Sequence, residues 1–244
     1  MRILFTNDDG YDSIGLHAVA DLFCGGHEIA VVAPSTQRSG YSHSLSMHAP
    51  VTCEKIAGYD YPVFALDGTP VDCVKFAYTR LFPTPDIVVS GINRGRNLGS
   101  DVMYSGTVSA ASEGAYLGLK SFALSLNSVE PREDSYRAAA KFFARNFDKL
   151  CSIELPKGSM FNINFPSGKP KGVKAAKMSI DIAFDDAYNP RDGKYMYKGA
   201  KRTEYREDTD EMFCENGYVT ITPLTIDRTD RVTLEKISKE KFEL

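Results

Sequence analysis

Two adjacent acids near the start of the chain, Asp8 and Asp9, are the first residues whose types and spacing suggest chemistry. They follow residues 3–6, an apolar run typical of a short strand that is buried on both faces. Two ionised carboxylates about 4 Å apart repel by roughly 4 kcal/mol at an effective dielectric constant of about 20, so a site that holds both needs a proton, a cationic side chain or a divalent ion. The only nearby basic residue, Arg2, lies at the other end of the strand, which makes Mg²⁺ or Mn²⁺ the simplest partner. The same residues also fit a plain turn, and this stretch alone does not decide between a turn and a metal site.

Two later loops carry further polar groups. The loop at 34–40 follows the second predicted strand, and its Ser39 hydroxyl suits a metal or a phosphate as well as an ordinary loop. The loop at 91–107 holds four glycines, two asparagines and three Ser or Thr residues between a strand and a helix, and a loop of this length is usually functional. Asn93 can offer a neutral oxygen to a cation. Ser105-Gly106-Thr107 opens the following helix, where backbone amides and the positive helix end favour a phosphate.

The elements that must position these residues alternate along the chain. We predict strands at residues 28–34, 61–66, 86–90, 121–126, 161–166 and 217–223, helices at 16–24, 70–81, 108–117 and 132–150, and extended structure over 41–57. Thr69, Pro70 and Asp72 form a capping-box start for the second helix, and Gly25-Gly26 is expected to end the first. Strands that are linked by helices favour a parallel sheet, whose ligands bind beyond the carboxyl ends of the strands. No Gly-x-Gly-x-x-Gly follows the first strand, which disfavours NAD or FAD.

Composition narrows the class of protein. The chain has 244 residues, 43% hydrophobic and 25% charged, with a formal net charge of −3, so it carries no basic footprint for a nucleic-acid polymer. Its five cysteines are widely spaced and contain no Cys-x-x-Cys pair, which fits a reducing cytoplasm. The N-terminal apolar run is too short for a signal peptide, and no run approaches a membrane span of about 20 residues. We expect a cytoplasmic protein that does not bind membranes.

The chain is long enough for one α/β domain, and we predict a single domain over 1–244. Residues 184–216 are rich in Asp, Lys, Arg and Tyr and show neither helical nor strand periodicity, so they are predicted to be an excursion from the core, either a substrate lid or a subunit-contact arm. The charged segment 225–244 is predicted to be a C-terminal tail that is helical at its end.

Several motifs in the first 224 residues occur together in a fixed order. They are Ile3-Leu4-Phe5-Thr6-Asn7-Asp8-Asp9-Gly10, Val32-Ala33-Pro34 with Arg38-Ser39-Gly40, Gly68-Thr69-Pro70-Val71-Asp72, Ser90-Gly91-Ile92-Asn93-Arg94-Gly95, Asn97-Leu98-Gly99, Tyr104-Ser105-Gly106-Thr107-Val108 and Gly217-Tyr218-Val219-Thr220-Ile221-Thr222-Pro223-Leu224. This set closely resembles the SurE family, the stationary-phase survival proteins that act as nucleotidases. The resemblance implies a three-layer, Rossmann-like α/β fold with a mostly parallel sheet. It also implies a homodimer or homotetramer that is built with a C-terminal extension.

The resemblance implies a metal-dependent phosphatase that releases phosphate from nucleoside monophosphates, a 5'-nucleotidase. By the same resemblance one divalent ion, Mg²⁺ or Mn²⁺, is held by Asp8, Asp9, Ser39 and Asn93. The phosphate is then held by the residues Gly40, Asn97, Ser105, Gly106 and Thr107. Attack by a water that the metal activates is the favoured mechanism, and direct attack by one of the two acids is the alternative. The sequence does not fix the preferred base or the activity on 3'-nucleotides or short polyphosphate.

Other classes of protein compete with this interpretation. A nucleotide-sugar glycosyltransferase resembles the opening around residues 25–32 but needs a second complete Rossmann domain, and a haloacid-dehalogenase-type phosphatase would end its first strand in Asp-x-Asp. The non-enzymatic alternative is a nucleotide-binding regulatory module that binds nucleoside monophosphate and metal without turnover. Phosphate release separates this module from an enzyme.

Overall fold

A computed structural model describes residues 1–181, 184–185, 188–197, 200–201 and 204–242. The strands are β1 (Arg2–Thr6), β2 (Glu28–Pro34), β3 (Cys53–Ile56), β4 (Val63–Leu66), β5 (Ile87–Arg94), β6 (Lys120–Leu126), β7 (Ser159–Phe165), β8 (Val173–Ala175), β9 (Phe184–Asp185), β10 (Tyr188–Arg191), β11 (Lys194–Tyr197), β12 (Ala200–Lys201) and β13 (Val219–Thr225). The helices are α1 (Ile14–Ala20), α2 (Pro70–Phe76), α3 (Gly106–Tyr116), α4 (Glu133–Ser152), α5 (Asp210–Glu215) and α6 (Arg231–Ile237), with a π-helical turn η1 (Ala77–Leu81) and a 3-10 turn η2 (Gly99–Met103).

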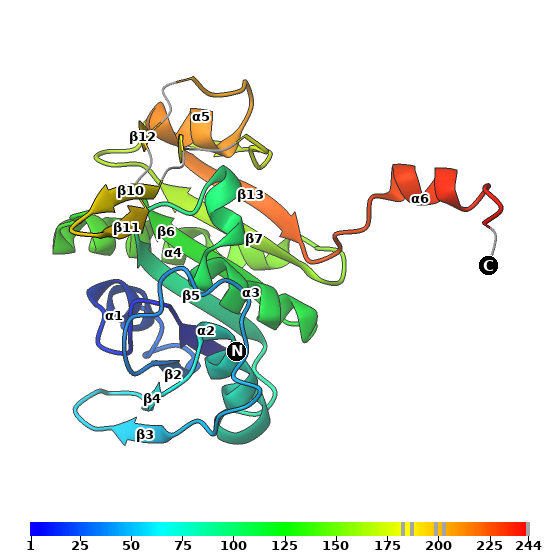
Figure 1. Cartoon of the computed structure of the whole chain (residues 1–244). Helices are drawn as coiled ribbons and strands as arrows, with labels where there is room; N and C mark the ends of the chain where they lie inside the picture. The colour runs from blue at the N-terminus through cyan, green and yellow to red at the C-terminus, as the bar shows by residue number, and fades with distance from the viewer. Residues whose placement is uncertain (182–183, 186–187, 198–199, 202–203, 243–244) are drawn as a thin grey trace.

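One nine-stranded sheet in the order β3-β4-β2-β1-β5-β6-β7-β13-β8 organises the molecule (Figure 1). The six strands from β4 to β7 are parallel, whereas β3 and β13 each run antiparallel to a neighbour. Apolar residues from α1 and α4 form the core on one face of the sheet, and residues from α2 and α3 form it on the other. The expected α/β fold with a mostly parallel sheet is therefore confirmed. The carboxyl end of β1 lies beside β5, where Thr6 pairs with Ser90, and β5 continues past it to Arg94.

The start of α2 follows from its local sequence. The Thr69 hydroxyl accepts the Asp72 N–H at 3.1 Å, and the Asp72 carboxylate accepts the Thr69 N–H at 2.8 Å, which confirms the capping box.

The predicted end of the first helix at Gly25-Gly26 is wrong, because α1 ends at Ala20 and residues 21–26 form turns.

The predicted extended segment at 41–57 is also wrong over most of its length. Only β3 pairs with another strand, along β4. The preceding residues satisfy their backbone groups elsewhere, since the Ser42 N–H donates to the Tyr104 carbonyl at 3.1 Å and the Ser46 N–H donates to Asp72 Oδ1 at 3.1 Å. Residues 41–52 are consequently a loop that follows the body of the protein rather than a strand.

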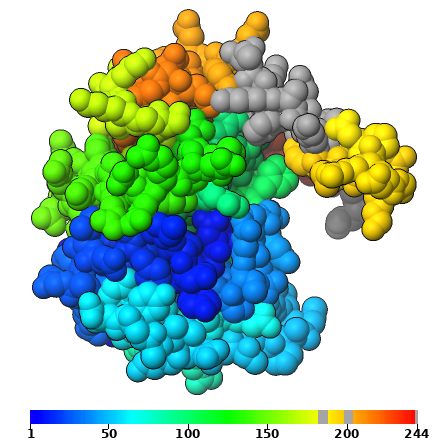
Figure 2. Space-filling view, turned by 90° about the vertical axis from the view of Figure 1, so that its left-hand side faces the viewer, coloured from blue at the N-terminus to red at the C-terminus, as the bar shows by residue number. Residues whose placement is uncertain are grey.

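Two segments project from the body. The β10–β11 hairpin is yellow in Figure 2, and its Tyr188, Tyr195 and Tyr197 side chains are exposed. Helix α6 stands apart from the rest of the chain in Figure 1 and buries none of its residues. Between these two segments, α5 and β13 return to the body, where Asp210, Glu211 and Cys214 are buried.

Candidate metal and phosphate site

The candidate site forms where β1 ends beneath the N-terminus of α3. Asp8 lies just after β1 and is 3% exposed, and its Oδ1 accepts a hydrogen bond from the Thr107 hydroxyl in the first turn of α3. The Gly106 backbone lies against the same carboxylate, since a Cβ added at Gly106 would stand 2.8 Å from Asp8 Cβ and 2.9 Å from Asp8 Oδ2. Only a residue without a side chain fits between α3 and Asp8. The positive end of α3 therefore lies directly on the first acid.

The second acid is fixed by the end of β5. The Arg94 N–H donates to Asp9 Oδ2 at 3.0 Å, so Asp8 faces α3 while Asp9 faces the neighbouring strand. Both acids lie beyond Thr6, the last residue of β1, so the alternation of side chains along a strand does not fix their directions. Each carboxylate is held by groups of a different element.

Burial controls the electrostatics of the pair. It raises the pKa of Asp8 to about 6, although the Thr107 hydroxyl bond lowers that pKa; the charge of Asp9 raises it further. Burial also raises the pKa of Asp9, against the lowering effect of the Arg94 N–H and the Arg94 charge. Both carboxyl groups therefore hold a proton more readily than ordinary acids, and a bound cation would favour their ionised form.

The other two predicted metal ligands lie on segments that contact these acids. Asn93 precedes the Arg94 N–H that binds Asp9, and its Nδ2 donates to the Gly95 carbonyl at 3.1 Å, which leaves Oδ1 as the oxygen for a cation. Ser39 follows Arg38, whose N–H donates to the Asp8 carbonyl at 2.7 Å. The Ser39 hydroxyl is exposed and accepts a hydrogen bond from Gln37 Nε2 at 3.0 Å.

The donor chemistry of these four residues fits a hard divalent ion. They supply two carboxylates, one amide oxygen and one hydroxyl, the oxygen donors that Mg²⁺ and Mn²⁺ prefer. Among the described residues there is no group of three or more His, Cys, Asp or Glu side chains arranged to hold a metal. If all four bound one ion, they would leave positions of an octahedron for water and phosphate oxygens.

The predicted phosphate residues lie in three places. Ser105 caps α3, since its Oγ accepts the Val108 N–H at 3.0 Å, so Ser105, Gly106 and Thr107 lie together beside Asp8. The Thr107 hydroxyl is already engaged by Asp8. Gly40 lies on the exposed loop with φ of +78° and open space around it.

Asn97 is held by an asparagine network that the sequence analysis missed. Its N–H donates to Asn164 Oδ1 at 2.8 Å, its carbonyl accepts from Asn162 Nδ2 at 2.8 Å, and its own Nδ2 donates to Ser125 Oγ at 2.7 Å. The alternating sequence Phe-Asn-Ile-Asn-Phe puts Asn162 and Asn164 on one face of β7, and two buried asparagines on one strand face were the available signal. Asn97 is thus anchored to β6 and β7.

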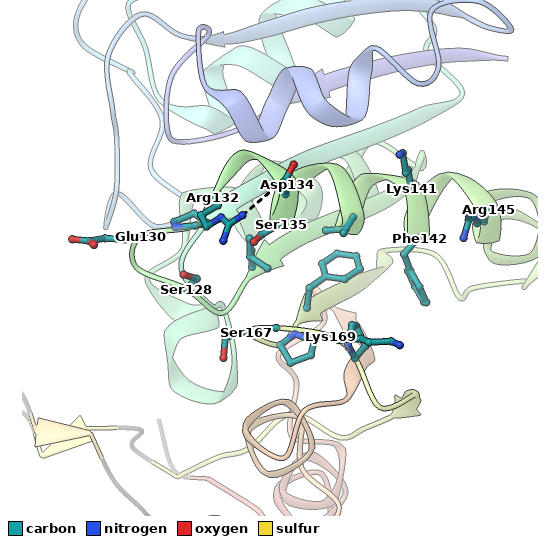
Figure 3. A pocket seen from close by; sticks show the side chains of 18 of the residues that line it. Ser128, Glu130, Arg132, Asp134, Ser135, Lys141, Phe142, Arg145, Ser167 and Lys169 are labelled. Atoms are coloured by element: carbon teal, nitrogen blue, oxygen red, sulfur yellow. Dashed lines mark hydrogen bonds and ion pairs between the residues drawn. The ribbon is translucent and has the colours of Figure 1, made fainter.

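A separate pocket of about 920 Å³ lies between α4 and the segment that follows β7 (Figure 3). Figure 3 shows Arg132 paired with Asp134 at one end, at 3.3 Å, and Phe142 extending between α4 and that segment. None of the predicted metal or phosphate residues lines this pocket, and its basic side chains do not converge on one point. It is therefore distinct from the candidate site.

The fold and the geometry of the site define an α/β protein with an oxygen-donor site at the carboxyl ends of parallel strands. Comparison with known proteins shows the family: the family described as "Survival protein SurE" matches residues 3–183. The chain is 39% identical over 239 residues to "5'-nucleotidase SurE" of Thermoanaerobacter sp. (strain X514), with 94% of each chain covered. It is 38% identical over 252 residues to the protein of that name from Pelotomaculum thermopropionicum, with 98% of this chain and 95% of the relative covered. This chain belongs to the SurE family.

A solved structure agrees with this assignment. The crystal structure of the SurE protein from Aquifex aeolicus superposes with a TM-score of 0.85 at 34% sequence identity and covers 98% of both chains. Within the described residues, no helix combines the length and the apolar character needed to cross a bilayer.

Proposed function

We propose that this chain is a metal-dependent phosphatase that hydrolyses nucleoside 5'-monophosphates to nucleoside and phosphate. The observation that carries the proposal is the buried Asp8 carboxylate against the N-terminus of α3, with a second acid and neutral oxygens on adjoining loops. The relatives named 5'-nucleotidase SurE support the choice of substrate. Nucleoside 3'-monophosphates and short polyphosphates present the same terminal phosphate and are candidates for further substrates.

Asp8, Asp9, Ser39 and Asn93 would hold one Mg²⁺ or Mn²⁺. When bound, such an ion neutralises phosphate oxygens and lowers the pKa of a water molecule. The protein's part is to fix the carboxylates: the Thr107 hydroxyl holds Asp8, and the Arg94 N–H holds Asp9. Because both acids accept hydrogen bonds that fix them in place, they are better suited to ligation than to direct attack on phosphorus.

The N-terminus of α3 is the proposed phosphate cradle. The Ser105 hydroxyl oxygen accepts the Val108 N–H, so its proton is available for a phosphate oxygen. Gly106 is in the first turn of α3, where backbone N–H groups lack partners within the helix and the helix dipole favours an anion. Asn97 and Gly40 would contact the phosphate from the flanking loops.

Phosphate release from a panel of nucleoside 5'- and 3'-monophosphates tests the proposed function. Metal-free enzyme should release none, and added Mg²⁺ or Mn²⁺ should restore release. Asp8→Ala should abolish turnover while the circular dichroism spectrum and the unfolding midpoint remain those of a folded protein. Binding of nucleotide and metal by the unmodified protein without any phosphate release would instead support the regulatory module.

We also propose that the protein assembles into a homodimer or homotetramer through its C-terminal segments. Helix α6 exposes Val232, Leu234 and Ile237 at 66%, 54% and 47%, an apolar surface that an isolated helix cannot bury by itself. A cavity of about 1020 Å³, bordered by α3 and residues 223–226, lies where the tail leaves the body and offers an apolar surface to a partner's tail. Light scattering should give a multiple of 27.0 kDa for the full chain and a smaller assembly when residues 227–244 are removed.

We further place the protein in the cytoplasm, because all five cysteines carry free thiols, as expected in a reducing compartment.

A further inference from the structure

A buried cluster of charges ties α5 to the loop that carries Asn97. Arg96 lies beside Asn97 with its side chain 8% exposed, and it bridges two elements. Its Nε lies 3.3 Å from Asp101 Oδ2 in its own loop, and its Nη1 donates to Glu215 Oε1 in α5 at 2.9 Å. The Glu211 carboxylate, also in α5, stands 3.8 Å from Arg96 Nη2. Charge-assisted contacts of this kind are strong where water is excluded.

A second contact anchors the same loop through its backbone. Asp210 is fully buried, and its Oδ2 accepts the Gly99 N–H at 3.0 Å while its Oδ1 accepts the N–H groups of Ser179 and Glu211 at 2.9 Å each. A Cβ added at Gly99 would stand 2.8 Å from Glu211 Cδ, so α5 packs directly on the loop. We call this set of contacts, from Arg96 and Gly99 to Asp210, Glu211 and Glu215, the α5 clamp.

The two anchors lie on either side of Asn97. Arg96 precedes it by one residue, and Gly99 follows it by two, so both neighbours of the proposed phosphate ligand are fixed to one short helix. The same loop continues through η2 to Ser105, the cap of α3. By contrast, the contacts described above for Asp8, Asp9, Asn93 and Ser39 involve none of the clamp residues.

From this arrangement we infer that Arg96 is a positioning residue for phosphate hydrolysis and that α5 sets the place of the phosphate-binding loop. The inference rests on the proposed function. Its physical basis is that displacing a group that contacts the substrate by about 1 Å lowers the reaction rate roughly 100-fold. The same displacement changes the unfolding free energy little, because that free energy is spread over many contacts. The chain therefore uses a helix about 110 residues further along to hold a loop of its first half.

The experiment compares the full-length enzyme with Arg96→Gln, Arg96→Lys and Asp210→Asn. In Arg96→Gln we expect kcat to fall about 100-fold, while the metal concentration for half-maximal rate stays within about twofold of the wild-type value. Arg96→Lys keeps the charge but loses the planar fork that reaches two acids together, so it should give an intermediate kcat. Amide hydrogen exchange across residues 97–104 should accelerate in Arg96→Gln and Asp210→Asn, and exchange in β1 should not change.

Two control variants separate positioning from stability. Arg137→Gln makes the same replacement in an exposed ion pair on α4 and should leave kcat and loop exchange unchanged. Leu150→Ala removes buried volume at the end of α4, away from the site, and lowers stability without touching the clamp. If Leu150→Ala reproduces the loss of kcat, or if folded Arg96→Gln keeps wild-type kcat and loop exchange, the positioning role is wrong.

If the wild-type enzyme releases no phosphate, the proposed function fails by itself. Amide hydrogen exchange then tests the α5 clamp independently of activity. Faster exchange confined to residues 97–104 in the Arg96→Gln and Asp210→Asn variants supports the clamp, and unchanged exchange overturns it.

Discussion

Replacing Gly106 by alanine tests the contact between α3 and the first acid. The added Cβ would stand 2.8 Å from Asp8 Cβ, 2.9 Å from Asp8 Oδ2 and 3.0 Å from Pro70 Cγ. Ordinary van der Waals contact begins at 3.4 Å, so Asp8 and the helix end must separate by about 0.6 Å. Asp8 is buried and Pro70 is rigid, which leaves the carboxylate and the first turn of α3 as the parts that shift.

The expected effects on activity and stability differ in size. Overpacking a core costs about 1–3 kcal/mol, and alanine returns up to about 1 kcal/mol of helix propensity, so the unfolding free energy should fall by about 0–3 kcal/mol. The same displacement moves a proposed metal ligand relative to the phosphate cradle. Because a misplacement of about 1 Å costs roughly 100-fold in rate, a displacement of about 0.6 Å should lower kcat by roughly 10- to 20-fold.

The assay is phosphate release from a nucleoside 5'-monophosphate at saturating metal, together with denaturant unfolding of the same preparations. Gly25→Ala is the matched control, because nothing lies within 4 Å of a Cβ at Gly25, and it should leave kcat unchanged. Wild-type kcat in folded Gly106→Ala would refute the tight apposition of α3 and Asp8. A loss of kcat in Gly25→Ala as well would show that the assay responds to alanine substitution in general.

Three further predictions concern the charges of the site and of the clamp. Thr107→Val removes the hydroxyl that donates to buried Asp8 and should weaken metal binding in a titration, whereas Thr107→Ser should retain it; equal affinity in both variants would contradict the role of the hydroxyl. Burial raises the pKa of Asp8 to about 6 and a metal ligand must be deprotonated, so metal affinity should rise from about pH 5 to about pH 7 and then level off. Burial also raises the pKa of Asp101 to about 6, so the stability that its protonated form contributes is present below about pH 4 and lost as the pH rises through 6. Asp101→Asn should flatten that decline in the unfolding free energy of metal-free protein, and an unchanged slope would show that Asp101 does not cause it.

Local patterns predicted the parts of the fold that depend on neighbours in sequence. The capping box of Thr69 and Asp72 lies within four residues, and the apolar runs of β1, β2 and β5 are buried because both faces of a parallel sheet are covered by helices. The predicted end of the first helix was wrong, since α1 ends at Ala20. The next residue, Asp21, accepts a hydrogen bond from the distant Tyr61 hydroxyl at 2.6 Å, a contact that helical spacing does not contain.

The site shows the same division. Charge repulsion at a strand end singled out Asp8 and Asp9, although this stretch fits a plain turn as well, and their role as metal ligands stays a prediction. Ser105-Gly106-Thr107 was recognised from the sequence only as the opening of a helix. The contacts that hold the loop around Asn97 could not be predicted from neighbouring residues. Asn164, which binds the Asn97 N–H, lies 67 residues away, and Glu215 of α5 lies 119 residues from Arg96. Residues 210–215 fell within the segment predicted to be an excursion, since a six-residue helix, half of it acidic, is too short to show a clear periodicity.

The proposed role of Asp8 is tested most directly by a metal titration of phosphate release from a nucleoside 5'-monophosphate by metal-stripped enzyme. We expect no release without metal, a saturable increase with Mg²⁺ or Mn²⁺, and no increase in folded Asp8→Ala at any metal concentration. Full phosphate release by the stripped enzyme, or restoration of the Asp8→Ala rate at high metal, would contradict the assignment of Asp8 as the ligand on which the site depends.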